Sequence, residues 1–261
     1  HDLRVWPVEV TRAQYFTYAA DLPLAQHPRA RDIRGGLRIG LKATAGLNFD
    51  QIALDSLTLY FGGADDVAWQ LHECVLAQPI GVLVRRPAGP GLLATLPGSA
   101  IAEVGFGDDE ALLPVTATGF SGFRLVQEYF AFPERFRFAR IDGLRAALAA
   151  CAADEVELVL LFSRGDAVLE KLVSADNVQL HCVPVVNLFP KRLDRVSVSE
   201  GVSQFHLLAD RTRPQDFEVH SLTEVVGHAA AVAGGEGARE QLFRPFYAAF
   251  HGSREAHPAY Y

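Results

Sequence analysis

The sequence contains no methionine in 261 residues, and its first residue is histidine. Because a translated chain normally begins with methionine and holds several more, we expect an excised piece of a longer protein. No Asn-x-Ser/Thr sequon occurs, and no apolar run approaches the roughly 20 residues of a membrane-spanning helix. Cysteine is also scarce. Cys74, Cys151 and Cys182 are odd in number and far apart, which predicts free thiols in a reducing compartment.

Positive charge is in the minority. The chain holds 24 lysine and arginine residues against 31 aspartate and glutamate residues, for a formal net charge of −7. No global field therefore attracts nucleic acid, and a general DNA or RNA binder is not expected. Lysine is confined to Lys42, Lys171 and Lys191, so the other basic residues are arginines, whose planar guanidinium favours protein interfaces.

Sequence motifs for catalysis are missing as well. There is no Walker loop and no G-x-G-x-x-G, and Ser121 lacks the spacing of a nucleophile elbow. His72 and Cys74, like His181 and Cys182, are expected to be structural rather than metal ligands. The acidic residues 108–110 have no second acidic cluster near them and predict a solvated loop. We therefore expect no catalytic residue, no metal and no cofactor.

Period-two alternation of apolar residues is the commonest pattern. It predicts strands over residues 37–43 and 57–61, expected in one sheet, then a helix from Asp65 that ends at Pro79 and a strand over 80–84. The glycine-rich residues 97–114 indicate a connector, so we expect domains over residues 1–113 and 114–261.

The second half also predicts short helices and strands. Helices are expected over 123–130 and from Asp142 to Ala153, with strands over 135–141 and 158–162. Further short strands are expected around 178–182, 196–198, 205–207 and 217–219. The fold class is α+β and β-dominated, with two antiparallel sandwich-like modules that carry short helices.

Aromatic residues and basic corners are the remaining features. We expect Tyr129, Phe130 and Phe132 to pack in a core between helix and sheet, with Pro133 fixing the turn that follows. A second corner is expected at Asn187, Phe189 and Pro190. The candidate partner-interface residues are basic and lie in predicted loops: Lys191, Arg192, Arg211 and Arg213.

Two long strings carry a family resemblance: residues 125–136 (LVQEYFAFPERF) and 184–192 (PVVNLFPKR). Shorter matches follow the same order at 46–49, 105–114, 174–176, 210–214, 219–221 and 243–247. The chain resembles the TssF family of type VI secretion baseplate subunits. The resemblance implies that the N-terminal helical segment and the extreme C-terminal region of that family lie outside this stretch of sequence.

The resemblance implies a scaffold rather than an enzyme, similar to the wedge protein of contractile phage tail baseplates. It implies assembly of the full-length protein with TssG, a second TssF copy, TssK and TssE around the spike hub. The assembly is expected in the cytoplasm, recruited to the inner-membrane complex, where it starts sheath polymerisation. One alternative remains: a carbohydrate-directed β-sandwich enzyme or binding module, for which a cleft lined by Trp6 or Trp69 with paired carboxylates would argue.

Overall fold

The computed structural model describes residues 4–87, 91–115, 120–199, 201–202, 204–228, 240–246 and 259–261. The chain forms two compact units, His1–Val186 and Asn187–Tyr261. The boundary expected at residue 113 is therefore wrong, because strands from both sides of that position pair with one another within the first unit. Residue 247, the last of the family motif at 243–247, lies outside the described residues.

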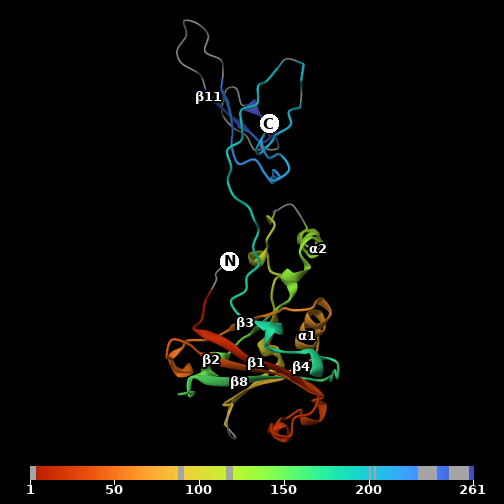
Figure 1. Ribbon diagram of the computed structural model, residues 1–261, viewed down its shortest axis with the longest axis vertical. Helices are drawn as coiled ribbons and strands as arrows, with labels where there is room; N and C mark the ends of the chain where they lie inside the picture. Colours follow the sequence, from red (N-terminus) through yellow and green to blue (C-terminus); the bar gives the residue numbers. More distant parts are fainter. Residues whose placement is uncertain are drawn as a thin grey trace. The chain divides into compact units, whose positions relative to one another are not determined.

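A five-stranded antiparallel sheet forms the base of the first unit (Figure 1). Its order is β1 (Val8–Phe16), β2 (Gly35–Ala43), β8 (Glu155–Phe162), β4 (Pro79–Arg85) and β5 (Leu92–Pro97). β8 is central, and its apolar run is buried on both faces, as a continuous hydrophobic strand requires. The strands expected over 37–43, 80–84 and 158–162 are confirmed, while β1 and β5 were not predicted.

A second, four-stranded antiparallel sheet faces the first. Its order is β6 (Ile101–Glu103), β7 (Phe138–Ile141), β3 (Leu57–Phe61) and β9 (Val178–Gln179). The expectation that residues 37–43 and 57–61 share one sheet is wrong, because β3 pairs with β7 and β9 while β2 pairs with β1 and β8. Their alternation shows that each strand has one buried face, but it does not say which neighbour the strand meets.

The helices of the first unit are α1 (Asp65–Ala77), α2 (Ser121–Ala131), α3 (Leu144–Leu148) and α4 (Leu169–Leu172). Of these, α1, α3 and α4 pack against the sheets. The main core joins both sheets with α1 and α3, and it includes Ile39, Leu59, Leu71, Leu144 and Leu160. Short 3-10 turns lie at Leu24–Gln26, Ala30–Asp32, Phe49–Gln51, Gly98–Ala100, Asp108–Glu110, Pro133–Phe136 and Ala175–Asn177.

Helix α3 is shorter than the predicted helix. The expected cap Asp142 accepts a hydrogen bond from Arg140 Nε instead, and Gly143, in a left-handed conformation, precedes the helix. The helix ends at Leu148, and farther along the chain the carbonyls of Cys151 and Ala153 accept hydrogen bonds from the backbone amides of Asp50 and Phe49.

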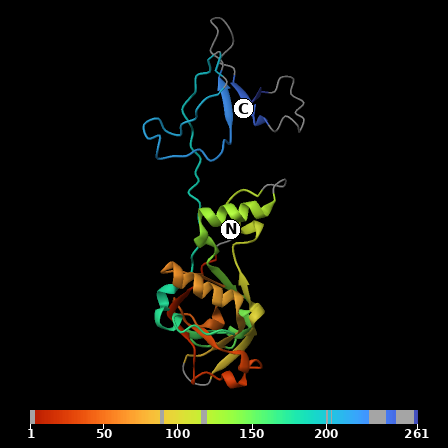
Figure 2. The same ribbon diagram turned by 90° about the vertical axis from the view of Figure 1, so that its right-hand side faces the viewer.

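Helix α2 lies apart from the two-sheet core of the first unit. Both views place it beyond α1, on the side away from the five-stranded sheet (Figures 1 and 2). It ends at Ala131, and Pro133 opens the 3-10 turn that leads to β7, as the sequence predicts for a proline after a helix. Its position leaves much of its surface uncovered.

The second unit carries a small sheet of β10 (Val225–His228), β11 (Glu240–Arg244) and β12 (Ala259–Tyr260). The strands expected at 196–198, 205–207 and 217–219 are wrong, since those residues have no regular structure. Within the part of this unit that the structure describes, no side chain is fully buried. Alternation alone could not find strands here because no core defines an inner face. Mostly antiparallel sheets with short helices nevertheless confirm the β-dominated α+β class.

Candidate interaction site

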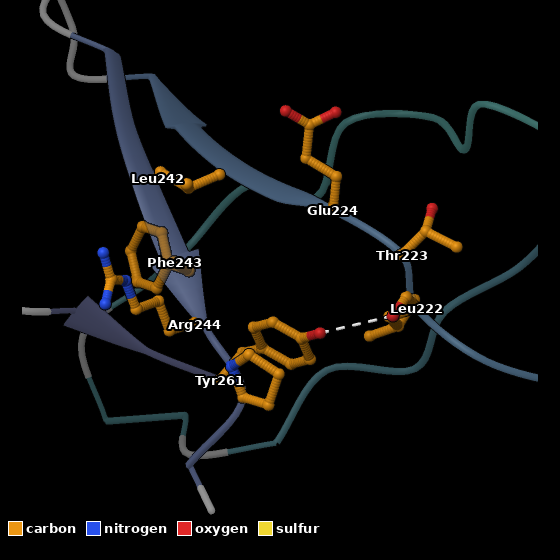
Figure 3. Close-up of a pocket in the computed structure, with 8 residues that line it drawn as sticks. Leu222, Thr223, Glu224, Leu242, Phe243, Arg244 and Tyr261 are labelled. Atoms are coloured by element: carbon orange, nitrogen blue, oxygen red, sulfur yellow. Dashed lines mark hydrogen bonds between the residues drawn. The ribbon is translucent and has the colours of Figure 1, made fainter. Parts of the chain in front are cut away.

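Two of the surface hollows among the described residues are candidates for a cleft. A shallow hollow of about 590 Å³ in the second unit is lined by Leu222, Glu224, Phe243 and Arg244, and the Tyr261 hydroxyl donates to the Leu222 carbonyl at its edge (Figure 3). A second hollow lies around Lys42 and Asn48 in the first unit. Neither contains Trp6 or Trp69, so the cleft that would favour a carbohydrate-directed module is not found in them.

The side chain of His72 lies in aromatic surroundings. His72 lies between the rings of Phe61 and Trp69, at 6.0 and 5.7 Å. Burial lowers the pKa of His72, with a smaller contribution from the Arg137 guanidinium. Among the described residues, no group of three or more histidine, cysteine, aspartate or glutamate side chains could hold a metal ion.

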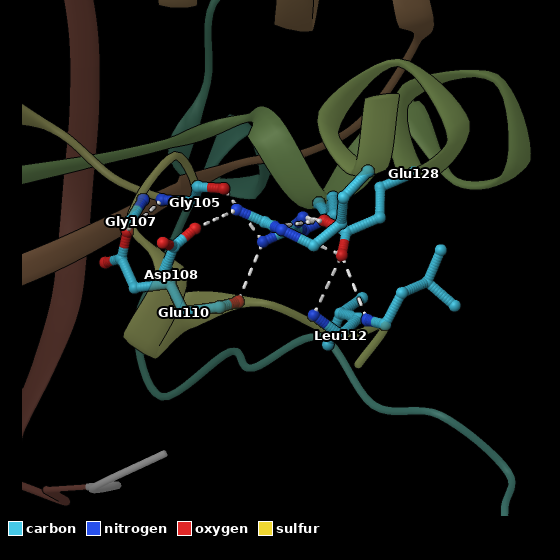
Figure 4. Close-up of polar contacts among 9 residues, drawn as sticks. Gly105, Gly107, Asp108, Glu110, Leu112 and Glu128 are labelled. Atoms are coloured by element: carbon cyan, nitrogen blue, oxygen red, sulfur yellow. Dashed lines mark hydrogen bonds and ion pairs between the residues drawn. The ribbon is translucent and has the colours of Figure 1, made fainter. Parts of the chain in front are cut away.

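The most unusual feature is the α2 platform, which we define as residues 104–115 and 120–136. Its helix turns charged side chains inward. Arg124 and Glu128, one turn apart, are both buried, and Arg124 Nη1 donates to both Glu128 oxygens at 3.3 Å. The backbone amides of Leu112 and Leu113 donate to Glu128 Oε1 at 3.1 and 2.9 Å (Figure 4). Glu128 thus ties the helix to the preceding loop.

Arg135 completes this buried network from the 3-10 turn after α2. Its Nη1 forms an ion pair with Glu128, and its Nη2 donates to the carbonyls of Gly105 and Glu110, both at 2.8 Å (Figure 4). The guanidinium also lies 4.6 Å from the ring centre of Phe136. Burial, with the neighbouring Arg124, lowers the pKa of Arg135, and pairing with Glu128 offsets the cost of removing these charges from water.

The loop of the platform is held together by hydrogen bonds from its backbone amides to the carboxylate of Glu110. Glu110 Oε2 accepts hydrogen bonds from the backbone amides of Gly105 and Gly107, at 2.7 and 3.2 Å. Gly105 has a φ of +104°, a conformation that side chains rarely adopt, and its carbonyl is the one that Arg135 binds. The expected solvated acidic loop is therefore an ordered part of the platform.

The outer face of α2 is aromatic and exposed. It consists of Phe123, Val126, Tyr129 and Phe130, with exposures of 76%, 56%, 51% and 81%. Phe132, after the helix, is 38% exposed. The expectation that Tyr129, Phe130 and Phe132 pack in a core is wrong, because the inner face of the helix is occupied by Arg124 and Glu128.

On the α2 platform the basic side chains are buried, whereas most acidic side chains are at least partly exposed. Its arginines, Arg124 and Arg135, are buried, while Asp108 and Asp109 are exposed and Glu110 and Glu134 are partly exposed. Asp108 also accepts a bond from Arg124 Nη2 at 3.0 Å. To a partner, the platform therefore presents an apolar aromatic stripe, and its exposed and partly exposed charges are acidic.

Two basic residues of the second unit, Lys191 and Arg213, lie over one aromatic ring. Lys191 Nζ lies 4.1 Å from the ring centre of Phe217 and 3.1 Å from Asp210, and Arg213 lies over the same ring at 5.9 Å. Phe189 packs edge-on against that ring. Thr212 and Lys191 hold the pKa of the Asp210 carboxyl below its usual value.

The other residues predicted for the partner interface and for the corner are Arg192, Arg211, Asn187 and Pro190. Arg211 donates to the Arg195 carbonyl and pairs with Asp194 at 3.5 Å, and Arg192 is exposed. Asn187 and Pro190 lie in a stretch without turns or bends, so the expected corner there is wrong. The structure thus brings Lys191, Arg213 and Phe189 together.

Comparison with known proteins identifies the chain. The family described as type VI secretion system, TssF, matches residues 1–261. The chain belongs to the TssF family. TssF1 of Pseudomonas aeruginosa, a component of the type VI secretion system, is 44% identical over 251 residues, which are 95% of this chain and 39% of that protein. The chain therefore spans less than half the length of this TssF relative.

A solved structure shows the same fold. One chain of the type VI secretion system TssK-TssF-TssG baseplate subcomplex, determined by cryo-electron microscopy, matches with a TM-score of 0.67 at 24% identity. The match covers 95% of this chain and 43% of that chain. Among the residues that the structure describes, every helix is too short or too polar to cross a bilayer.

The sequence did not lead to a prediction of the most distinctive residues of the α2 platform. Phe123, Val126 and Phe130 recur at helical spacing, and Arg124 and Glu128 recur on the opposite side. This two-faced pattern was available in the sequence. The usual rule that apolar residues face inward would, however, have placed the wrong face in the core.

Proposed function

We propose that this chain is a non-catalytic scaffold segment of a type VI secretion baseplate. The supporting observation from the structure is the α2 platform, where buried ion pairs hold an aromatic face outward. Exposed apolar patches of this kind are typical of protein contacts. The match to the TssF family over residues 1–261 supports the same function.

The full-length protein, on this proposal, assembles with TssG, TssK, TssE and a second TssF copy around the spike hub. The solved TssK-TssF-TssG subcomplex supports the first two partners by analogy. The assembly lies in the cytoplasm and is recruited to the inner-membrane complex. The three free cysteines fit a reducing compartment.

The non-catalytic part of the proposal rests on how buried charges are used. Glu128, the most buried carboxylate among the described residues, has its oxygens occupied by two arginines and two backbone amides. A carboxylate so paired is held in place structurally and is a poor candidate for accepting a proton from a substrate.

Co-purification of the full-length protein with TssG and TssK tests the scaffold function. We expect a stable complex, and failure to associate with either protein in any combination would contradict the proposal. A purified complex should also show no glycan binding, whereas specific retention on a glycan array would favour the carbohydrate-directed alternative.

We further propose the basic residues Lys191, Arg192, Arg211 and Arg213 as a partner contact. Arg192 is the cleanest probe, because it is exposed and each of the other three pairs with an aspartate. Arg192→Glu should weaken assembly at unchanged folding, since exposed charges alter association more than stability. Arg31→Glu, an exposed arginine in the first unit, is the control. If both variants assemble equally well, the proposed partner contact is wrong.

A further inference from the structure

The outer face of α2 is built to be covered. Phe123, Val126 and Phe130 follow the i, i+3, i+7 spacing of one helical stripe, and Tyr129 borders it. Tyr129 is held from behind by Phe136, at 6.1 Å between ring centres. The stripe is thus preorganised by a helix whose inner side is fixed through Glu128.

We propose that this face docks a basic amphipathic helix of another baseplate protein, an inference that rests on the proposed scaffold function. Helix α2 has 11 residues and is therefore about 16 Å long. That length matches an apolar stripe that runs along roughly three turns of a partner helix. Because the backbone groups of α2 are used within the helix, it offers a partner side chains rather than a strand edge.

Charge defines the chemistry of this partner. The exposed and partly exposed charges of the platform are carboxylates, namely Asp108, Asp109, Glu110 and Glu134, while its arginines are buried. An incoming helix with lysine or arginine beside its apolar stripe would pair with them. The described residues of the platform leave no exposed cation to attract an acidic helix.

The same charges argue against two other occupants. A second copy of this chain would bring its own Asp108 and Asp109 against these, and like charges brought together across an interface cost affinity. An anionic membrane surface would repel the acidic groups, whereas interfacial helices that bind such membranes carry lysine and arginine on the polar face.

Photo-crosslinking tests the proposal. The full-length protein carries p-benzoyl-phenylalanine at Phe130 in cells that assemble the baseplate, and mass spectrometry identifies the crosslinked peptide. We expect a peptide from a different protein, with apolar residues at helical spacing and adjacent lysine or arginine. The same photo-amino acid at Tyr18, which is 82% exposed on the first unit, is the control and should not capture that peptide.

Charge reversal adds a second measurement. Asp109→Lys with Glu134→Lys should reduce the crosslink yield by at least about tenfold, and lysine-to-glutamate changes in the captured peptide should restore it. The matched control, Glu9→Lys with Glu73→Lys, makes the same charge change at exposed positions elsewhere and should leave the yield unchanged. Unaltered melting temperatures will show that the variants fold.

Several outcomes would overturn the proposal: a crosslink to a second copy, to another segment of the same chain or to lipid, no crosslink, or a yield indifferent to charge reversal. Co-purification of the unmodified protein with TssG and TssK is measured in the same cells. If that complex forms while the crosslink fails, only the docking proposal is wrong. Loss of the complex itself would contradict the scaffold function.

Discussion

Glu128 and Arg135 form an ion pair that is almost completely buried, directly beneath a helix whose outer face is aromatic. Glu128 belongs to α2 and Arg135 to the turn that follows it, so the pair joins two consecutive elements. Together with Arg124 and the amides of Leu112 and Leu113, it replaces the apolar contacts by which a surface helix usually docks.

Removal of the Glu128 charge should be strongly destabilising. Glu128→Gln leaves Arg135 buried without the counter-charge of Glu128 and leaves Arg124 with its exposed partner Asp108, and we expect a loss of about 3–5 kcal/mol in the stability of the platform. Urea denaturation and hydrogen exchange of the α2 amides will measure it. Asp108→Asn is the control, because its pair with Arg124 is more than half exposed on the aspartate side and should contribute less than about 1 kcal/mol. Equal losses for the two variants would contradict this account.

The loss of stability when an aromatic residue is replaced by alanine should depend on how deeply its ring is buried. Phe61→Ala removes a fully buried ring from the main core and should cost about 3–5 kcal/mol. Phe130→Ala should change the free energy of unfolding by less than about 0.5 kcal/mol, because that ring is 81% exposed. Phe132→Ala should fall between them. Thermal and chemical denaturation check the order, and a Phe130 variant as unstable as the Phe61 variant would show that the helix is turned the other way.

His72 should make stability depend on pH. Burial lowers its pKa in the folded protein below the ordinary value of 6.5, so the unfolded chain binds the proton more readily. The stability that neutral His72 contributes is therefore present above about pH 6.5 and is lost as the pH falls through its lower folded value. Melting temperatures measured from about pH 7.5 to 5 should decline less steeply in His72→Gln. His220→Gln, at an exposed position, is the control and should keep the slope of the parent.

Replacement of Gly36 by alanine should destabilise the packing of β2 against its neighbours. A Cβ added there would lie against the carbonyl oxygen of Leu160 and 2.6 Å from the Phe16 ring, in the middle of the five-stranded sheet. We expect Gly36→Ala to cost about 1–3 kcal/mol, because the backbone or the ring must shift. At Gly91 an added Cβ meets, among the described residues, the flexible side chain of Arg86, so Gly91→Ala should be nearly neutral. Denaturation midpoints compare the two.

Local patterns were sufficient for individual elements where one face meets a core. The alternation in 37–43, the apolar run in 158–162 and the stripe of α1 each predicted an element that the structure contains. Around 196–219, the same alternation predicted strands that do not form. No side chain of the second unit is fully buried in its described part, so nothing there turns an alternating pattern into a paired strand.

By itself, the sequence determined the β-dominated class, the positions of β2, β8, α1 and α2, and membership of the TssF family through ordered motifs such as residues 125–136. Tertiary structure alone decided that β2 and β3 lie in different sheets, and that α2 turns Arg124 and Glu128 inward. The physical reason is that the partners of Glu128, at Leu112, Leu113 and Arg135, come from other segments. An amphipathic pattern shows that a helix has two faces, but the donors and acceptors of its neighbours determine which one is buried.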